Sequence, residues 1–223
     1  IWKQMTFFAM PIFLGNLFQQ LYNTVDSLIV GNFLGSSALA AVSSSGSLIF
    51  MLIGFLSGIS AGAGVIVARF FGAGDEKNLQ RAVHTTVAFG LVAGVLMTGV
   101  GVALSPQILR WMDTPESVMR ESVTYLQIYF AGSLGFVMYN VLVGILQAVG
   151  DSRHPLYYLI VSSVINLVLD LLFITGFHTG VGGAAVATVI SQIVSALLCF
   201  WQLLRTKESY GLKIRKIRFD KGI

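Results

Sequence analysis

The sequence has 223 residues, of which 55% are hydrophobic and 11% are charged, with a formal net charge of +4 at pH 7. About 25% of the residues of an ordinary soluble domain are charged, so this composition excludes a soluble enzyme, a disordered chain and a coiled coil. The composition therefore indicates an integral membrane protein.

Six apolar stretches are long enough to cross a membrane, because a bilayer core about 30 Å thick needs roughly 20 apolar residues per helix. The breaks between them carry Gly, Ser, Pro and Asp, which are typical of turns. We therefore expect an all-α membrane protein, a bundle of six transmembrane helices within residues 1–204. The helices are predicted at about residues 6–34, 46–71, 82–104, 122–149, 156–177 and 183–204.

Twelve of the 14 basic residues fall on the side of the membrane that holds both termini, and Arg110 and Arg120 fall on the other. The positive-inside rule then predicts a multi-pass protein of the cell inner (plasma) membrane with both termini in the cytoplasm. Basic residues gathered on one side of the membrane set its topology and contact membrane lipid, and this accounts for the positive net charge. We therefore expect no nucleic-acid partner.

Residues 205–223 form a basic segment after the last predicted helix. Three interpretations stay open for this tail: a solvated cytoplasmic flank, an amphipathic helix at the membrane surface, or a linker to a second bundle. The sequence begins at Ile1 and lacks the pattern of a cleavable signal peptide, so we expect a fragment of a longer protein.

Two of the ten acidic residues fall at membrane depth: Asp26 in the first predicted helix and Asp170 in the fifth. No Lys or Arg is predicted deep in any helix, so neither acid has an obvious cationic partner. A carboxylate in the hydrocarbon region is costly, and such residues usually belong to ion or proton pathways. We expect the two acids to exchange a cation, the alternative being protonated acids that only hydrogen-bond between helices.

Neutral oxygen-bearing side chains accompany these acids. Asn166 lies four residues before Asp170 and so shares its helix face. Asn140 and Thr188 offer oxygen atoms from two further helices, although such residues often serve only helix packing. The set suits a proton network or a Na⁺ site at Asp26, Asn166, Asp170 and Thr188, and we favour H⁺ because nothing demands full coordination of a metal.

Pro11 lies early in the first predicted helix, inside an apolar run. Proline removes a backbone hydrogen bond and clashes with the preceding turn, so it kinks a helix. A static kink is the commoner case, but the position of Pro11 on the Asp26 helix suggests a hinge that responds to protonation.

Enzymatic chemistry has little support in the sequence. His84, His154 and His178 share no metal-ligand spacing and are predicted at the surface, and no nucleotide or zinc motif is present. An intramembrane aspartyl protease is disfavoured because the Gly-Asp pairs, at 74–75 and 150–151, fall in predicted loops. We therefore expect no catalytic residues, no enzymatic activity and no cofactor.

Five segments, taken in order, resemble the multidrug and toxic compound extrusion (MATE) family. They are residues 11–42 (beginning PIFLGNLFQQLY), 67–75 (VARFFGAGD), 146–155 (LQAVGDSRHP), 166–170 (NLVLD) and 180–188 (GVGGAAVAT). The pair of Asn166 and Asp170 is similar to that of the DinF-like branch.

The resemblance implies a protein of twelve helices in two lobes that open alternately to the two sides of the membrane. Such transporters export organic cations in exchange for H⁺ or Na⁺, and this chain resembles the N-terminal lobe. The resemblance also implies a cation site on that lobe and a first helix that bends with protonation. The matching residues are Asp26, Tyr125, Asn140, Asn166, Asp170 and Thr188 for the site and Pro11 for the bend.

We therefore expect a secondary active multidrug efflux antiporter for cationic or amphipathic small molecules, completed by a missing C-terminal lobe or by a second copy. Two other functions stay open. A flippase for lipid-linked precursors would be expected to line its lumen with cations, and a non-transporting membrane scaffold would tolerate the loss of both deep acids.

Overall fold

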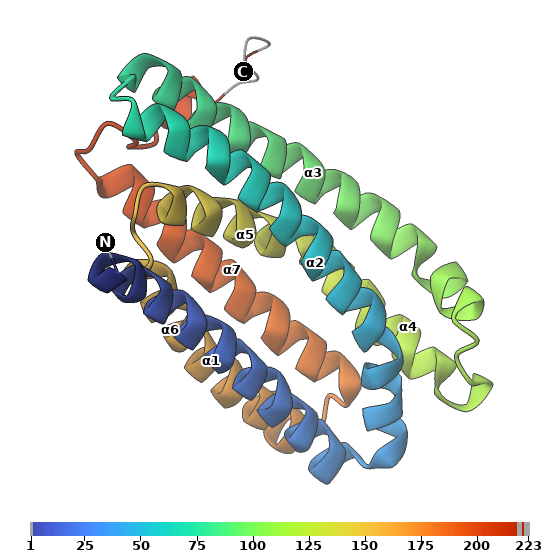
Figure 1. Cartoon of the computed structure of the whole chain (residues 1–223). Coiled ribbons are helices and arrows are strands. Elements are labelled where there is room, and N and C mark those ends of the chain that lie inside the picture. Colours follow the sequence, from blue (N-terminus) through green and yellow to red (C-terminus); the bar gives the residue numbers. More distant parts are fainter. Residues whose placement is uncertain (1, 218–219, 221–223) are drawn as a thin grey trace.

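The computed structural model describes residues 2–217 and 220, and these residues form helices and no strand (Figure 1). The all-α membrane bundle predicted from the sequence is confirmed. The long helices are α1 (Trp2–Leu34), α2 (Ser36–Gly72), α3 (Glu76–Trp111), α4 (Glu116–Ala131), α5 (Ser133–Ala148), α6 (Arg153–Leu171) and α7 (Val181–Arg205). A π-helix, η1 (Leu172–Gly176), extends α6, and a short 3₁₀-helix, η2 (Ile214–Lys216), lies in the tail.

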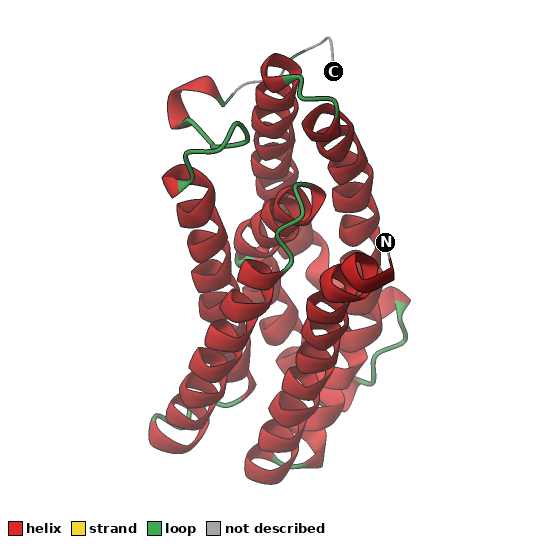
Figure 2. Cartoon of the chain, turned by 60° about the vertical axis from the view of Figure 1, so that its left-hand side comes forward, coloured by secondary structure: helices red, strands yellow, loops and turns green. Residues whose placement is uncertain are grey.

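The helices run alongside one another and their connections gather at the two ends of the bundle (Figure 2). The stretch at 122–149, expected as one span, consists of α4 and α5, which meet at Gly132 with a bend of 50°. Gly132 lacks a Cβ, and the side chain of Val189 in α7 occupies the space that a Cβ would need. The bend is therefore fitted to the neighbouring helix.

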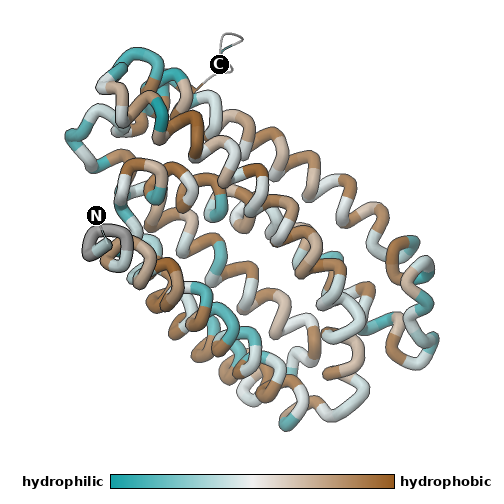
Figure 3. Tube along the Cα trace, in the orientation of Figure 1, coloured by the Kyte–Doolittle hydropathy of each residue, from teal (hydrophilic) through white to brown (hydrophobic). Residues whose placement is uncertain are grey.

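By length and hydropathy, four of the described helices qualify as membrane spans, and five do if the bent pair counts as one. The remaining long helix, α1, has 33 residues but carries polar side chains along its length. Figure 3 shows these hydrophilic positions on α1 between apolar ones. A polar helix of this length is stable in a bilayer when its polar side chains face the protein interior or a hydrated cavity.

The centre of the bundle is α7, which packs along α5, α6 and α4, whereas α1 packs mainly along α6 (Figure 1). Half of the most apolar part of α7 is buried, compared with 11% for α2. The buried face of α7 is built largely from small side chains, namely Gly183, Ala184, Ala185, Ala187, Thr188, Ser191, Ser195 and Ala196. Small residues allow helix backbones to approach closely in membranes, so α7 can be surrounded on several sides.

Close helix contacts also depend on two glycines of α5. A Cβ on Gly144 would lie 3.0 Å from the backbone oxygen of Ser60 in α2, and one on Gly135 would lie 3.3 Å from the Cα of Ile193 in α7. Such distances are shorter than ordinary van der Waals contact with a backbone atom. These glycines therefore hold α5 against both α2 and α7.

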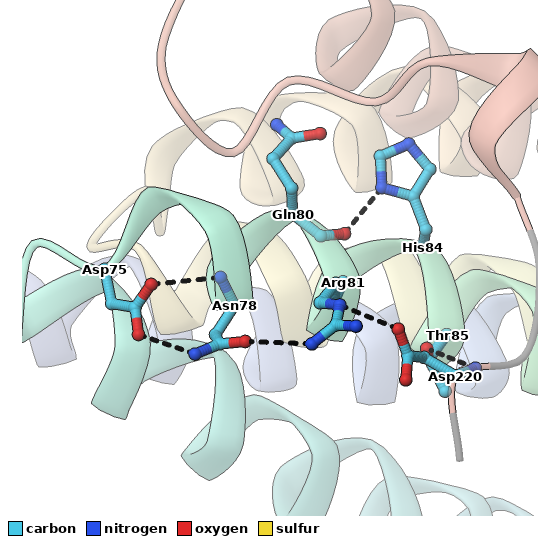
Figure 4. A network of polar contacts seen from close by, with 7 residues as sticks. All are labelled: Asp75, Asn78, Gln80, Arg81, His84, Thr85 and Asp220. Atoms are coloured by element: carbon cyan, nitrogen blue, oxygen red, sulfur yellow. Dashed lines mark hydrogen bonds and ion pairs between the residues drawn. The ribbon is translucent and has the colours of Figure 1, made fainter. Parts of the chain in front are cut away.

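The turn between α2 and α3 is fixed by Asp75, which caps α3. Its carboxylate accepts hydrogen bonds from the backbone N–H of Asn78 at 3.1 Å and from the Asn78 side-chain amide at 2.7 Å (Figure 4). These bonds favour the ionised carboxylate and lower the pKa of Asp75 below its usual range.

The tail folds back onto α3. Leu212 is 3% exposed and donates its backbone N–H to the carbonyl of Leu203 at 2.8 Å. The side-chain amide of Gln80 in α3 donates to the carbonyls of Ser209 and Gly211. In the described part of the tail the backbone is bonded to the bundle and the one helical element is the short 3₁₀ turn, so no amphipathic helix forms there. Side chains such as Lys213, Arg215 and Lys216 are exposed, and the interpretations as a cytoplasmic flank or as a linker stay predictions.

His84, expected at the surface, is 3% exposed because the tail covers it. Its Nδ1 lies 2.6 Å from the carbonyl oxygen of Gln80, and its Nε2 lies 3.0 Å from the backbone nitrogen of Lys213. A carbonyl oxygen only accepts, so Nδ1 donates to Gln80. Nε2 lies against both backbone groups of Lys213, since the carbonyl oxygen of that residue is 3.1 Å away. His154 is partly exposed and pairs with Asp151, whereas His178 is exposed.

Candidate cation-coupling site

The fold brings together the two acids that the sequence places at membrane depth. Asp26, in the C-terminal half of α1, is 9% exposed, and Asp170, in the last turn of α6, is fully buried. Their carboxyl groups lie close enough to interact electrostatically with each other. The packing of α1 along α6 thus converts two isolated acids into a pair.

One oxygen of each acid lacks a donor from the described part of the protein. The Oδ1 atoms of Asp26 and Asp170 are both buried, and neither receives a hydrogen bond from the described side chains or backbone. Two ionised carboxylates at this range repel strongly in a medium of low dielectric constant. A proton shared between them, or a cation bound to both, removes the repulsion and satisfies the oxygens.

Asn166 connects the acid pair to α7. In the amide orientation that satisfies both of its polar atoms, its nitrogen donates to Asp170 Oδ2 at 2.8 Å and its oxygen accepts the backbone N–H of Thr188 at 3.2 Å. Asn166 is 1% exposed. The four-residue spacing on α6 therefore places the Asn166 amide where it contacts both the Asp170 carboxylate and the backbone of α7.

A pocket of about 210 Å³ opens beside the acid pair and is lined from α1, α2, α4, α5 and α7. Asp26, Tyr125 and Thr188 line it, so three of the residues predicted from the sequence meet there. Its other polar lining residues are Gln19, Tyr22, Asn23, Ser27, Tyr129 and Gln192. Among the described residues, no Lys or Arg lines it.

Tyr22 and Gln192 were not predicted from the sequence. The Tyr22 hydroxyl is buried and faces the side chains of Thr188 and Ser191, and Gln192 Oε1 is a buried acceptor without a donor among the described residues. Tyr22 lies one helical turn before Asp26 and so shares its helix face, and this spacing could have identified it from the sequence. Both residues extend the polar surface around the acids.

Asn140 and Pro11 lie in a second pocket, of about 480 Å³, between α1, α2, α5 and α6. The Asn140 amide donates to the carbonyl of Phe136 at 2.9 Å, one turn earlier in its own helix. Asn140 thus faces this second pocket and does not line the pocket beside the acids, whereas Gln19 lines both. The polar residues that line the second pocket are Asn16, Gln19, Ser57, Ser60, Tyr139, Asn140, Gln147 and Ser152, and the described residues place no charged side chain there.

The helix that carries Asp170 changes its winding directly after the acid, where η1 begins at Leu172. Single π turns inside α-helices are frequently found at functional sites. Among the described residues, no group of three or more His, Cys, Asp or Glu is arranged to hold a metal ion. Any metal here would depend on the two carboxylates and neutral oxygens.

Comparison with known proteins identifies the family. The family model described as MatE matches residues 11–172, which is most of the chain, and the protein therefore belongs to the MatE family of transporters. The chain is 36% identical over its whole length to the probable multidrug resistance protein YoeA of Bacillus subtilis, covering 48% of that protein. It is 28% identical over 201 residues to DNA damage-inducible protein F of Escherichia coli, an alignment that covers 88% of this chain and 43% of that protein.

The fold agrees with this assignment. A crystal structure of a MATE protein in the bent conformation superposes with a TM-score of 0.90 at 27% identity, covering 99% of this chain and 49% of that one. The chain thus spans about half the length of the relatives that it matches. The resemblance to one lobe of a MATE transporter, stated from the sequence, is confirmed.

Proposed function

We propose that this chain forms the N-terminal lobe of a secondary active multidrug efflux antiporter that exchanges its substrate for a cation by alternating access. The observation that carries the proposal is the buried pair of Asp26 and Asp170, which has no basic partner among the residues lining its pocket. A lone buried pair must take up or release a cation whenever the site changes its access to water. A purely structural role would have no need of two acids in contact.

The geometry supports H⁺ more than Na⁺ as the coupling ion. Na⁺ is a hard cation that requires several oxygen ligands, as Ca²⁺ and Mg²⁺ do. The amide nitrogen of Asn166, and not its oxygen, faces Asp170, while the oxygen accepts the backbone N–H of Thr188, so Asn166 offers no ligand oxygen beside that carboxylate. The carboxylates of Asp26 and Asp170 remain, and a single proton satisfies them.

The second pocket, which Asn140 and Pro11 line, is the proposed site for substrate, and we call it the amide-lined pocket. Its volume of about 480 Å³ is within the range of small-molecule sites, roughly 300–1,000 Å³. Amide and hydroxyl side chains with no fixed charge can bind several amphipathic or cationic molecules. The absence of Lys and Arg from this lining gives no support to a flippase for anionic lipid precursors.

A second lobe is the proposed partner of this chain. Both pockets are lined by α1 and α2, and these helices expose large apolar side chains such as Phe13, Phe50 and Phe55. A matching bundle, from the same chain or from a second copy, would close the pockets on that side. The basic end of the bundle would lie in the cytoplasm and the protein in the cell membrane.

The test is transport by the intact protein in sealed vesicles loaded with a fluorescent cationic dye. We expect an imposed proton gradient to drive dye export, and an imposed Na⁺ gradient at equal pH on both sides to drive none. Export driven by Na⁺ alone would replace H⁺ as the coupling ion. Failure of both gradients to drive export would contradict antiport.

A further inference from the structure

A third pocket lies at the basic end of the bundle, away from the acid pair and from the pocket that Asn140 faces. It has a volume of about 740 Å³ and lies between the first turns of α3 and the returning tail. Figure 4 shows the side chains of α3 that face the tail there, with Arg81 between Asn78 and Asp220. The lining residues are Glu76, Lys77, Gln80, Arg81, His84, Arg215, Lys216 and Asp220.

The pocket is shaped by specific contacts between α3 and the tail. Gln80 donates to tail carbonyls, His84 accepts the N–H of Lys213, and Thr85 Oγ1 accepts the backbone N–H of Asp220 at 3.2 Å. Arg81 forms an ion pair with Asp220 at 2.8 Å. These contacts fix the tail on both sides of η2, so the basic side chains of η2 are held at the pocket.

The pocket carries an excess of positive charge. Four basic and two acidic side chains line it, and Arg81 is engaged by Asp220. Lys77, Arg215 and Lys216 make no ion pair with any acid in the described part of the chain. Lys77 comes from α3 and the other two from the tail, so an anion in the pocket would contact both segments.

The pocket lies at the level of lipid headgroups. The stretch of α3 from residue 85 to residue 109 holds no charged side chain. At 1.5 Å per residue it is about 37 Å long, enough to cross a hydrocarbon core of about 30 Å. The preceding turns, which line the pocket, therefore project into the headgroup region.

We propose that this pocket binds a phosphate-bearing anion, with the headgroup of an anionic phospholipid and soluble inorganic phosphate as the two sources of that chemistry. Arg offers paired N–H donors that match phosphate oxygens, and Lys adds point charges. A bound phosphate joins Lys77 to Arg215 and Lys216 and so fastens the tail to α3. The site is independent of the acid pair and of the proposed transport function.

The test measures binding to the intact protein in an uncharged detergent by native mass spectrometry. The probes are short-chain phosphatidylglycerol, short-chain phosphatidylcholine and inorganic phosphate. One variant replaces the pocket cations (Lys77→Gln, Arg215→Gln, Lys216→Gln). A matched control removes one Arg and two Lys at the same end but outside the pocket lining (Arg69→Gln, Lys207→Gln, Lys213→Gln).

We expect phosphatidylglycerol to bind in preference to phosphatidylcholine, and the pocket variant to weaken this binding by about fivefold for each cation removed. The control variant keeps the affinity of the unmodified protein. Binding of inorganic phosphate with the same sensitivity to the pocket variant, without binding of phosphatidylglycerol, assigns the site to a soluble anion.

If the pocket variant and the control variant lost phosphatidylglycerol binding equally, the proposal would be overturned, because the lipid would then be attracted by the overall charge of this end of the bundle. Equal binding of the two lipids, with no binding of phosphate, would also overturn it. All substituted side chains are exposed, so the variants are expected to fold. As a second measurement, hydrogen exchange over residues 206–217 should slow when the anion is added, in the control variant but not in the pocket variant.

Discussion

The carboxyl group of Asp26, in α1, lies close enough to that of Asp170, in α6, to interact with it electrostatically, although the two helices are the first and sixth of the bundle. We expect the position of α1 to depend on the charge of this pair. Adding a proton would replace repulsion with a hydrogen bond and draw α1 towards α6. Removing it favours separation of the helices or entry of water.

Replacing either acid by its amide should uncouple transport from the ion gradient. Asp26→Asn and Asp170→Asn keep the size of the side chain but cannot take up and release a proton. We expect each variant to lose gradient-driven dye export, while the free energy of unfolding changes by only about 1 kcal/mol, the usual scale of one hydrogen bond. Vesicle transport and thermal unfolding of the same preparations provide the two measurements.

The exposed acid Glu121 offers a control for these variants, because it lies at a helix end away from both pockets. Glu121→Gln should export dye at the rate of the unmodified protein. Normal export by Asp26→Asn or by Asp170→Asn would remove the coupling role from that residue.

Asn166 should act through Asp170. Asn166→Ala removes the donor to the carboxylate and the acceptor for the Thr188 N–H, and we expect it to lower the free energy of unfolding by roughly 1–2 kcal/mol. This cost should be smaller in an Asp170→Ala background, because one of the two contacts is then already lost. Unfolding of the four proteins of this cycle measures the difference.

The exposed Asn32, on α1, provides the matched control for that cycle. Asn32→Ala should cost little in either background. An equal cost of Asn166→Ala with and without Asp170 would indicate that Asn166 serves only helix packing.

The acids and Asn166 could be found from the sequence because a charge at membrane depth is conspicuous and because a spacing of four residues fixes a shared helix face. The pocket that Asn140 faces depends on how α5 is placed against its neighbours, and the sequence did not predict the 50° bend that separates α5 from α4. Tyr22 was missed because tyrosine is ordinary in an apolar helix, although it lies one turn before Asp26. His84 was misplaced because its partner, the backbone of Lys213, is 129 residues away in the sequence.

The choice of coupling ion has a direct spectroscopic test. If H⁺ is the ion, hydrogen exchange in α6 at fixed pH should not depend on whether the buffer contains Na⁺ or K⁺. The physical reason is that Asn166 presents its amide nitrogen, a donor, to Asp170, so the carboxylate has no amide oxygen beside it to share in binding Na⁺. Slower exchange around Asp170 in Na⁺ than in K⁺ would instead indicate a bound Na⁺.

The proline of α1 should act as a hinge. Pro11 lies inside α1 and lines the amide-lined pocket, and its ring leaves a carbonyl of the preceding turn without its helical partner. Pro11→Ala restores that bond, so we expect slower transport with the acid pair still able to bind a proton. Spin labels at the exposed positions Leu21 in α1 and Leu96 in α3 should report a distance that changes with pH in the unmodified protein and changes less in the variant. A distance independent of pH, together with normal transport by Pro11→Ala, would identify a static kink.

The tail should be released when its hydrogen bonds to α3 are removed. His84→Ala leaves the backbone N–H of Lys213 without its side-chain partner, and an unsatisfied buried donor costs roughly 1–3 kcal/mol. Local opening then becomes more frequent, and trypsin, which cuts after Lys and Arg, should cleave within residues 206–217 about tenfold faster or more. His178→Ala removes an exposed imidazole and should leave the cleavage rate unchanged.

Because the Gln80 side chain holds the same segment through two carbonyls, Gln80→Ala should accelerate cleavage as well. Unchanged cleavage in both α3 variants would mean that burial of Leu212, and not the polar contacts, keeps the tail in place.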